Sequence, residues 1–480
     1  MENKKQAIIL SVIASIALLV LIVGATYAYF QASGGTGTNT DVKVTTYTTD
    51  VFNFEVGSDI SIYADATSFA SGKGNASGST FAKAILTANN KTNTATEHYY
   101  LYLNISNNTF LYTQNESTPE LLLTITDASG NAVTDITSLA YKTVTDGKGT
   151  SISGYDITNK SGLITLFNNK EITASPTKTD EWNITVTLVN YDKDQSNNMG
   201  KSFNAKLMIQ KEAYKKTLAE YVKSQYTGTQ GDNGIYYHES SLANGAGDNS
   251  YRYAGASDSV NNYICLGSDA TTCPDANLFR IIGVFGDKTK VIRAKSVGDK
   301  AWHSSSSNTW SSSSLNTYLN GEYLTSLGTL ADKIATTTWK VGGGTWSNIA
   351  TSVPKTAYQN EVGSSASSTT VDKKIGLMYV SDYYYSASPS AWTLVGYNSN
   401  DATKDYRTAK TTNWLYLGST EWTISRISDY TFFAFYVSST GYVSNNYVTD
   451  SFAVRPSFNL LSSTTYVSGS GSMSDPVRVN

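Results

Sequence analysis

The feature that most constrains the fold is a strict alternation of apolar and polar side chains along residues 182–189. The apolar residues Trp182, Ile184, Val186 and Leu188 fall at every second position, as in a strand that buries one face. Similar patterns cover residues 41–56, 60–63, 81–87, 98–105, 121–125, 163–167 and 182–191. About seven short strands joined by turn sequences predict a β-sandwich of the jelly-roll type over residues 41–210.

The composition supports a mainly β fold with more than one domain. A chain of 480 residues exceeds the size at which a single core keeps growing. It contains 34 Tyr against 15 Phe, and its Ser, Thr and aromatic residues suit strands. With 36 basic and 39 acidic residues the net charge is −3, so we expect no nucleic-acid partner.

An uncharged stretch predicts a membrane-spanning or signal helix over residues 1–30. Residues 7–23 carry no charge and follow Lys4 and Lys5. A helix of about 24 residues is roughly 36 Å long, enough to cross a hydrocarbon core of about 30 Å. The lysines favour a cytoplasmic N-terminus, so the chain after a linker at residues 31–40 is expected outside the cell.

The expected localisation depends on whether this helix is retained or removed by signal cleavage. Small residues precede Tyr29, so signal cleavage between Ala28 and Tyr29 is one expectation. Cleavage would give a secreted or cell-surface protein. Without it, the helix would anchor the protein in the cell membrane with its C-terminal region outside.

Two motifs resemble the TasA/camelysin family of Gram-positive biofilm-fibre and surface proteins. Residues 24–30 (GATYAYF) are similar to the ending of that family's signal sequences. Residues 182–203 combine a Trp-containing strand, a turn with Asp194 and Gln195, and the sequence GKSF, which resembles the family's closing hairpin. The resemblance implies processing by a dedicated signal peptidase and a sandwich domain behind the signal.

A connector at residues 211–234 contains the most convincing helix predicted outside the membrane segment, and residues 315–320 predict a second, short one. Residues 211–226 are rich in helix formers, with apolar residues at helical spacing from Leu218 to Tyr226. A glycine-rich stretch at residues 228–234 ends it. Because its other faces are charged, we expect a solvated linker helix.

The two cysteines, Cys265 and Cys273, lie close together in the C-terminal region at residues 235–480. In an exported chain such a pair favours a disulfide, with free thiols as the alternative. Zinc needs four ligands, and the 3 His are scattered. We therefore expect no metal site.

The order of motifs in this region resembles a widespread uncharacterised domain of bacterial surface proteins. The motifs are NLFRIIG at residues 277–283, SLNTYLN at 314–320 behind Trp310, a late Trp strand, and VRP at 454–456. That domain in turn resembles the C-type-lectin/formylglycine-enzyme fold. The resemblance implies a mixed α/β ligand-binding domain in which Arg455 is buried and supports the fold.

The sequence contains no arrangement that predicts catalysis. A nucleophile needs a base within reach and a group that orients the base. His303 has only neighbouring serines, and the chain contains no G-x-S-x-G motif. We interpret His303 as a surface-loop residue and expect no enzyme activity and no cofactor.

A tyrosine-rich tail supplies the candidate binding surface. Tyr, Ser and Asn combine rigid contact area with adaptable hydrogen bonding, although the same residues could be core and strand residues. The candidate ligand-binding residues are Tyr383, Tyr384, Tyr385, Tyr442, Asn445, Asn446 and Tyr447. We therefore expect an adhesin-like surface protein that binds a glycan or a surface protein. The alternatives are a fibre subunit, in which residues 41–56 complete a neighbouring sandwich, and a secreted enzyme.

Overall fold

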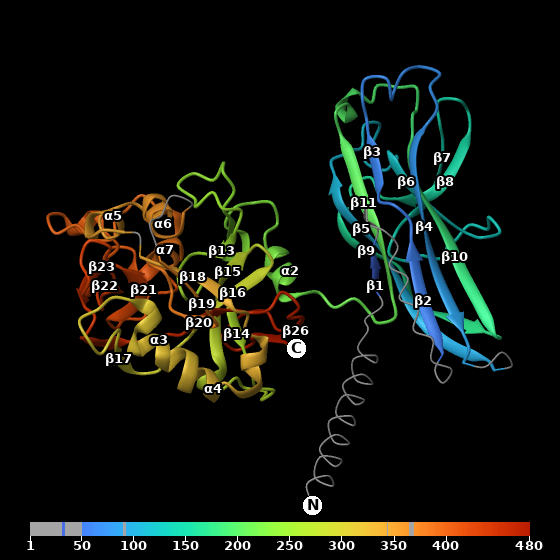
Figure 1. Ribbon diagram of the computed structural model, residues 1–480. Helices are drawn as coiled ribbons and strands as arrows, with labels where there is room; N and C mark the ends of the chain where they lie inside the picture. The colour runs from blue at the N-terminus through green and yellow to red at the C-terminus, as the bar shows by residue number, and fades with distance from the viewer. Residues whose placement is uncertain (1–30, 34–49, 90–92, 343, 364–368) are drawn as a thin grey trace, which may run out of the picture. The chain divides into compact units, whose positions relative to one another are not determined.

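The chain forms two compact, mainly β units in the computed structural model, which describes residues 31–33, 50–89, 93–342, 344–363 and 369–480 (Figure 1). Unit 1 extends to Tyr214 and unit 2 comprises Lys215–Asn480. The predicted N-terminal helix and the cleavage position between Ala28 and Tyr29 lie outside the described residues. Within the described ranges, no helix combines the length and apolarity that a membrane crossing requires.

In unit 1 the part of the chain that the structure describes forms two antiparallel sheets. The first has the order β1-β11-β5-β9, with β3 also paired to β11, and the second has the order β2-β4-β10-β6-β8-β7. The first sheet contains β1 (Gln31–Ser33), β3 (Ile60–Tyr63), β5 (Ala95–Asn108), β9 (Gly162–Ala174) and β11 (Ser202–Gln210). The second contains β2 (Val51–Val56), β4 (Ala76–Thr87), β6 (Leu121–Asp127), β7 (Tyr141–Thr145), β8 (Ser151–Asp156) and β10 (Thr177–Leu188).

The alternation seen in the sequence decides which side of β10 faces the core. Trp182, Ile184, Val186 and Leu188 are buried, whereas Asn183 between them is exposed. Apolar residues from both sheets belong to one hydrophobic cluster, so the sheets pack face to face. Burying each Ile or Leu stabilises the fold by about 1.5–3 kcal/mol. The strands β7 and β8 were not predicted, because their short sequences are mostly polar.

The described residues of unit 2 form three sheets with shorter strands. The largest runs β20-β25-β16-β15-β14-β27-β26, with β12 and β13 attached beside β15; the second runs β17-β24-β21-β22-β23, and β18 pairs with β19. The first has β12 (Ile235–Tyr237), β13 (Tyr251–Tyr253), β14 (Tyr263–Cys265), β15 (Leu278–Phe285), β16 (Lys288–Arg293), β20 (Ile375–Gly376), β25 (Ser457–Asn459), β26 (Tyr466–Ser468) and β27 (Val477–Val479). The others have β17 (Asp299–Ala301), β18 (Thr337–Val341), β19 (Thr369–Lys373), β21 (Glu421–Arg426), β22 (Phe433–Val437), β23 (Val443–Tyr447) and β24 (Ser451–Ala453).

Short helices complete unit 2. They are α2 (Leu218–Lys223), α3 (Ser314–Tyr318), α4 (Leu324–Ser326), α5 (Trp346–Ile349), α6 (Pro354–Val362) and α7 (Val380–Tyr385). The strand β15 and the helix α7 are buried along their whole length, apart from the half-buried Phe285 at the end of β15. The core of this unit therefore lies between its main sheet, its second sheet and α7.

The predicted linker helix is wrong in both length and environment. Helix α2 begins only at Leu218, because the side chain of Thr217 accepts a hydrogen bond from the backbone N–H of Glu220 in a capping box. Leu218 and Val222 are fully buried and belong to the core of unit 2. The segment is therefore part of unit 2, and its apolar stripe packs against β15 and β16.

Candidate functional site

The predicted binding tyrosines Tyr383, Tyr384 and Tyr385 lie on α7 and are buried, with at most 1% of each residue exposed. The prediction that they form a ligand-binding surface is therefore wrong, because a ring without exposed area cannot contact a ligand. Each hydroxyl donates a hydrogen bond to a backbone carbonyl, of Gly441, Ile349 and Asn244 respectively. These bonds satisfy the polar end of each ring inside the core.

The N-terminus of α7 lies in a buried polar cluster that the sequence did not predict. The Asp382 carboxylate accepts hydrogen bonds from the Lys290 ammonium at 2.5 Å and from the backbone N–H of Tyr379 at 2.8 Å. The Glu361 carboxylate accepts the backbone N–H groups of Val380 and Ser381, both at 3.0 Å. Burial raises the pKa of Glu361 to about 7. Charged residues on one strand and two helices thus converge at a single helix end.

Arg455 is buried, as the resemblance implied. Its guanidinium donates to both carboxylate oxygens of Glu421, at 2.7 and 2.8 Å, and to the carbonyl of Leu415 at 2.6 Å. His303 is only 8% exposed, so its interpretation as a surface-loop residue is wrong. Its Nδ1 accepts the backbone N–H of Ser305 at 3.1 Å, and burial lowers its pKa. This contact closes a local turn.

The remaining candidate residues lie on or beside β23, the last strand of the second sheet of unit 2. Asn445 and Asn446 are half-buried, and Tyr447 is 52% exposed. Strand β23 pairs with β22 along its whole length. It is therefore an edge strand with one side free of ladder partners in the described part of the unit.

Tyr447 belongs to an aromatic group at this edge, which we name the edge aromatic cluster: Tyr430, Phe432, Phe433 and Tyr447. The ring of Tyr447 stacks on Phe432 with centroids 5.7 Å apart and contacts Phe433 at 4.7 Å. Tyr430 lies 5.9 Å from Phe432 and is 51% exposed. Phe432 and Phe433 are half-buried, so Tyr430 and Tyr447 provide most of the exposed aromatic surface.

Tyr442 does not join this cluster. It is half-buried, and its ring packs 5.0 Å from Tyr397 and 6.4 Å from Tyr436. The Arg407 guanidinium lies 5.7 Å from the same ring. The structure therefore places Asn445 and Tyr447 on one face of β23 and Asn446 on the opposite face, and it separates Tyr442 from Tyr447. It adds Tyr430, Phe432 and Phe433, whose signal in the sequence was the aromatic run YTFF at residues 430–433.

Unit 1 has an open cleft of about 890 Å³ beside β9. Phe167 and Trp182 lie at its base, but each is only 8% exposed. The Lys170 ammonium lies over both rings, at 5.6 and 5.4 Å, and the Trp182 indole N–H donates to the Tyr99 hydroxyl at 2.8 Å. The cleft therefore offers less free aromatic surface than the edge aromatic cluster does.

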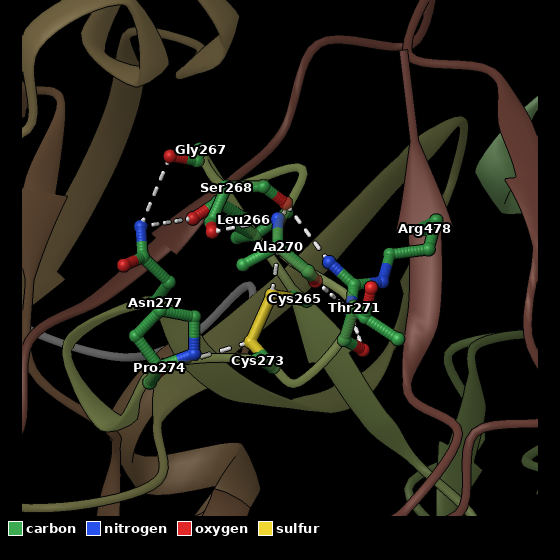
Figure 2. The surroundings of a disulfide bond; sticks show 10 residues. All are labelled: Cys265, Leu266, Gly267, Ser268, Ala270, Thr271, Cys273, Pro274, Asn277 and Arg478. Atoms are coloured by element: carbon green, nitrogen blue, oxygen red, sulfur yellow. Dashed lines mark hydrogen bonds between the residues drawn. A yellow bond between two sulfur atoms is a disulfide. The ribbon is translucent and has the colours of Figure 1, made fainter.

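The predicted disulfide is confirmed. Cys265 at the end of β14 is bonded to Cys273, with Cα atoms 5.8 Å apart (Figure 2). Two side chains fix the loop that it closes: the Asn277 amide donates to the Leu266 and Gly267 carbonyls, and the Arg478 guanidinium donates to the Ser268, Ala270 and Thr271 carbonyls. The disulfide therefore stabilises a local loop beside β27.

A family model described as a domain of unknown function (DUF6273) matches residues 286–462. The matched stretch contains Glu361, Asp382, Arg455 and the edge aromatic cluster, and it excludes both cysteines. No curated protein and no solved structure matches the chain. In the described ranges, no group of three or more His, Cys, Asp or Glu side chains is placed to hold a metal ion.

Proposed function

We propose that this protein is a bacterial surface recognition protein whose ligand contacts the edge aromatic cluster of unit 2. The single observation that supports the proposal is a mutually packed group of four aromatic residues beside an edge strand, in which Tyr430 and Tyr447 are exposed and Phe432 and Phe433 are half-buried. Packing holds the rings in place, so binding requires little additional ordering of side chains. Enzyme activity is not part of the proposal.

The chemistry of this surface suits a glycan or a surface protein. Aromatic faces pack against the apolar faces of sugar rings and form the centres of protein interfaces. The amides of Asn445 and Asn446 lie on the same strand and can both donate and accept hydrogen bonds.

Export and display at the cell surface belong to the same proposal. They depend on residues 1–30, whose sequence has the features of a signal or anchor, and on the disulfide of Cys265 and Cys273, which is typical of proteins outside the cytoplasm. The jelly-roll, C-type-lectin and TasA/camelysin relationships stay predictions. They would make unit 1 a spacer and unit 2 the displayed recognition domain.

Binding of the full chain to a broad glycan array and to whole bacterial and host cells tests the proposal. We expect wild-type binding and at least a tenfold loss for the double variant Phe432→Ala/Tyr447→Ala, because central aromatic contacts carry about 2 kcal/mol or more. Tyr63→Ala is a matched control, since Tyr63 is 65% exposed in unit 1. Wild-type protein that binds neither the array nor the cells, or equal loss in both variants, would contradict the proposal.

A second candidate function is a fibre subunit that assembles by strand addition. The observation that favours it is the pairing of the short strand β1 with β11, in which Gln31–Ser33 align with Met208–Gln210 at the edge of the first sheet of unit 1. A strand from a neighbouring subunit could occupy the same edge. Sedimentation of protein processed at Tyr29 tests this function, and a concentration-independent monomer would rule it out.

A further inference from the structure

The ion pair between Lys290 and Asp382 has an unusual setting. Among the described residues, Lys290 is the only lysine that is buried. Its Nζ lies 2.5 Å from Oδ2 of Asp382, and the two side chains are 6% and 3% exposed. Lys290 belongs to β16 and Asp382 to α7, 92 residues apart in sequence. Folding therefore holds an amine and a carboxyl group in contact inside the core.

Burial disfavours the charged forms of this pair. The rings of Tyr379, Trp339 and Phe285 lie 4.5, 5.4 and 5.8 Å from the Lys290 Nζ, and their faces attract the ammonium. Burial lowers the pKa of Lys290, and this effect outweighs the attraction of Asp382. A buried ion pair recovers its desolvation cost only in part. Transfer of one proton from the ammonium to the carboxylate gives a neutral amine and a carboxylic acid at the same contact.

A third group can move protons in this site. Glu361 is fully buried, and burial, with Asp382 nearby, raises its pKa to about 7. The Ser425 hydroxyl and the backbone N–H groups of Val380 and Ser381, the two residues that directly precede Asp382 on α7, fix its position. A carboxyl group with a pKa near neutrality can both accept and return a proton.

We propose that Lys290 and Asp382 condense to an intramolecular amide bond, with Glu361 as the proton carrier. The Lys290 amine attacks Cγ of Asp382, so an Nζ–Cγ bond forms and one Cγ–O bond breaks. Glu361 accepts a proton from Nζ and returns it to the departing oxygen, which leaves as water. The amide retains one hydrogen on nitrogen, Glu361 ends unchanged, and no oxidant or reductant is needed.

Three physical factors favour this condensation over a persistent ion pair. The fold holds the reacting groups in contact, which removes the entropy cost of bringing them together. The reaction replaces two buried charges by one neutral amide. The backbone N–H of Tyr379 donates to Asp382 at 2.8 Å, so it orients the carboxyl group and polarises it as the nucleophile attacks.

The amide would link the main sheet of unit 2 directly to α7. The disulfide joins residues only 8 positions apart, so it constrains a single loop. A bond from β16 to α7 would instead span most of the matched domain at residues 286–462. It would prevent the helix from separating from the sheet under pulling force, which suits a domain that carries load at a cell surface.

Unit 1 provides an internal control. Lys142 lies 3.0 Å from Oδ2 of Asp156, but the Lys142 side chain is 31% exposed. Water stabilises its charged form, and the carboxylate also accepts the Tyr112 hydroxyl at 3.0 Å. We therefore expect this pair to remain an ion pair while the pair in unit 2 reacts.

Peptide mapping of the purified full chain, after reduction and digestion, tests the proposal. We expect a branched peptide containing Lys290 and Asp382 that is lighter by one water than the sum of its two parts. Lys142 and Asp156 should appear only in linear peptides. Linear, unmodified peptides for Lys290 and Asp382 in the wild-type protein would overturn the proposal, and this measurement requires no variant to fold.

Two variants then test the assigned roles. Lys290→Arg retains a cation beside Asp382 but lacks a nucleophilic amine, so only linear peptides are expected. Glu361→Gln cannot carry the proton, and we expect the ion pair to persist with at least a tenfold slower appearance of the branched peptide. Near-ultraviolet circular dichroism establishes that each variant is folded. Formation of the branched peptide at the wild-type rate in folded Glu361→Gln would overturn the role of Glu361.

Discussion

Among the described residues of unit 1 no Lys, Arg or His is buried, whereas unit 2 buries Arg252, Arg280, Lys290, Arg455, His238 and His303. The difference follows from the regularity of the two units. Unit 1 has long strands, such as β4 and β10, which pair over 12 residues. The backbone N–H and C=O groups of neighbouring strands therefore hydrogen-bond to one another. Alternating apolar residues form most of its core, and the buried carboxylates of Glu120 and Asp156 accept hydrogen bonds from neighbouring side chains.

Unit 2 has many short strands and irregular segments, whose buried carbonyls need other donors. Buried guanidinium groups supply them. Arg280 donates to the carbonyls of Trp414 and Val260, at 3.3 and 3.1 Å, and Arg455 donates to Leu415. The comparison teaches that an irregular β unit can be held together by a few charged side chains. Such a unit should therefore be more sensitive to the loss of one charge than a sandwich is.

The largest expected effect is the loss of Arg455. Arg455→Met leaves the Glu421 carboxylate buried without its cation, which we expect to lower the free energy of unfolding of unit 2 by about 3–5 kcal/mol. Urea unfolding followed by hydrogen exchange measures each unit separately. Lys83→Ala is the control in unit 1, where the pair with Glu181 is about one-third exposed and is worth under about 1 kcal/mol. Equal losses would contradict the contrast between the units.

The corresponding weak point of unit 1 is its apolar core. Ile184→Ala removes a fully buried side chain from β10 and is expected to cost about 2–5 kcal/mol. Asn183→Ala, at the neighbouring exposed position, should change stability by no more than about 0.5 kcal/mol. The same denaturation measurement applies. A similar loss in the free energy of unfolding for both variants would mean that the alternation of apolar and polar residues along β10 does not determine its buried face.

The buried Glu361 predicts a pH dependence of unit 2. Its pKa is about 7 in the folded protein against 4.5 for the unperturbed group, so the stabilisation is fully present below pH 4.5. It is lost as the pH rises through 7, because the folded core must then accept the charge, with a total loss of about 3 kcal/mol. Glu361→Gln should lack this loss. Wild-type and variant curves that remain parallel between pH 4.5 and 7 would contradict the prediction.

Loss of the disulfide should have a smaller effect that is restricted to unit 2. Replacing both Cys265 and Cys273 by Ser opens a loop of about nine residues, and chain entropy predicts a cost of about 2.6 kcal/mol. A reducing agent added to wild-type protein should reproduce the shift in the denaturation midpoint of unit 2. An equal shift in unit 1 would show that the loop stabilises more than its own unit.

The smallest effect concerns the start of unit 2. Thr217→Ala removes the N-cap of α2 and should destabilise unit 2 by about 1 kcal/mol, because Leu218 and Val222 are part of its core. Lys215→Ala, an exposed change just before the cap, should have no measurable effect. A thermal scan with hydrogen exchange detects the difference. If the helix were a solvated linker, neither variant would change the stability of unit 2.

The sequence alone determined the features that depend on neighbouring residues. The spacing of Trp182, Ile184, Val186 and Leu188 specified the buried face of β10, because a strand turns alternate side chains to opposite faces. The short spacing of Cys265 and Cys273 in sequence likewise predicted the disulfide, because nearby residues can form this bond within one loop. Of the edge aromatic cluster only Tyr447 was predicted, together with its neighbours Asn445 and Asn446 on the same strand.

Only the tertiary structure decided the rest. All six residues of α7 are buried, so the helix has no polar face, and Tyr383–Tyr385 looked like an exposed recognition motif. Lys290, Glu361 and Asp382 occupy a strand and two helices that meet only after folding. The local sequence pattern indicates which residues share a face of a strand or helix. The packing of the whole unit decides which charged residues, distant in sequence, are buried together.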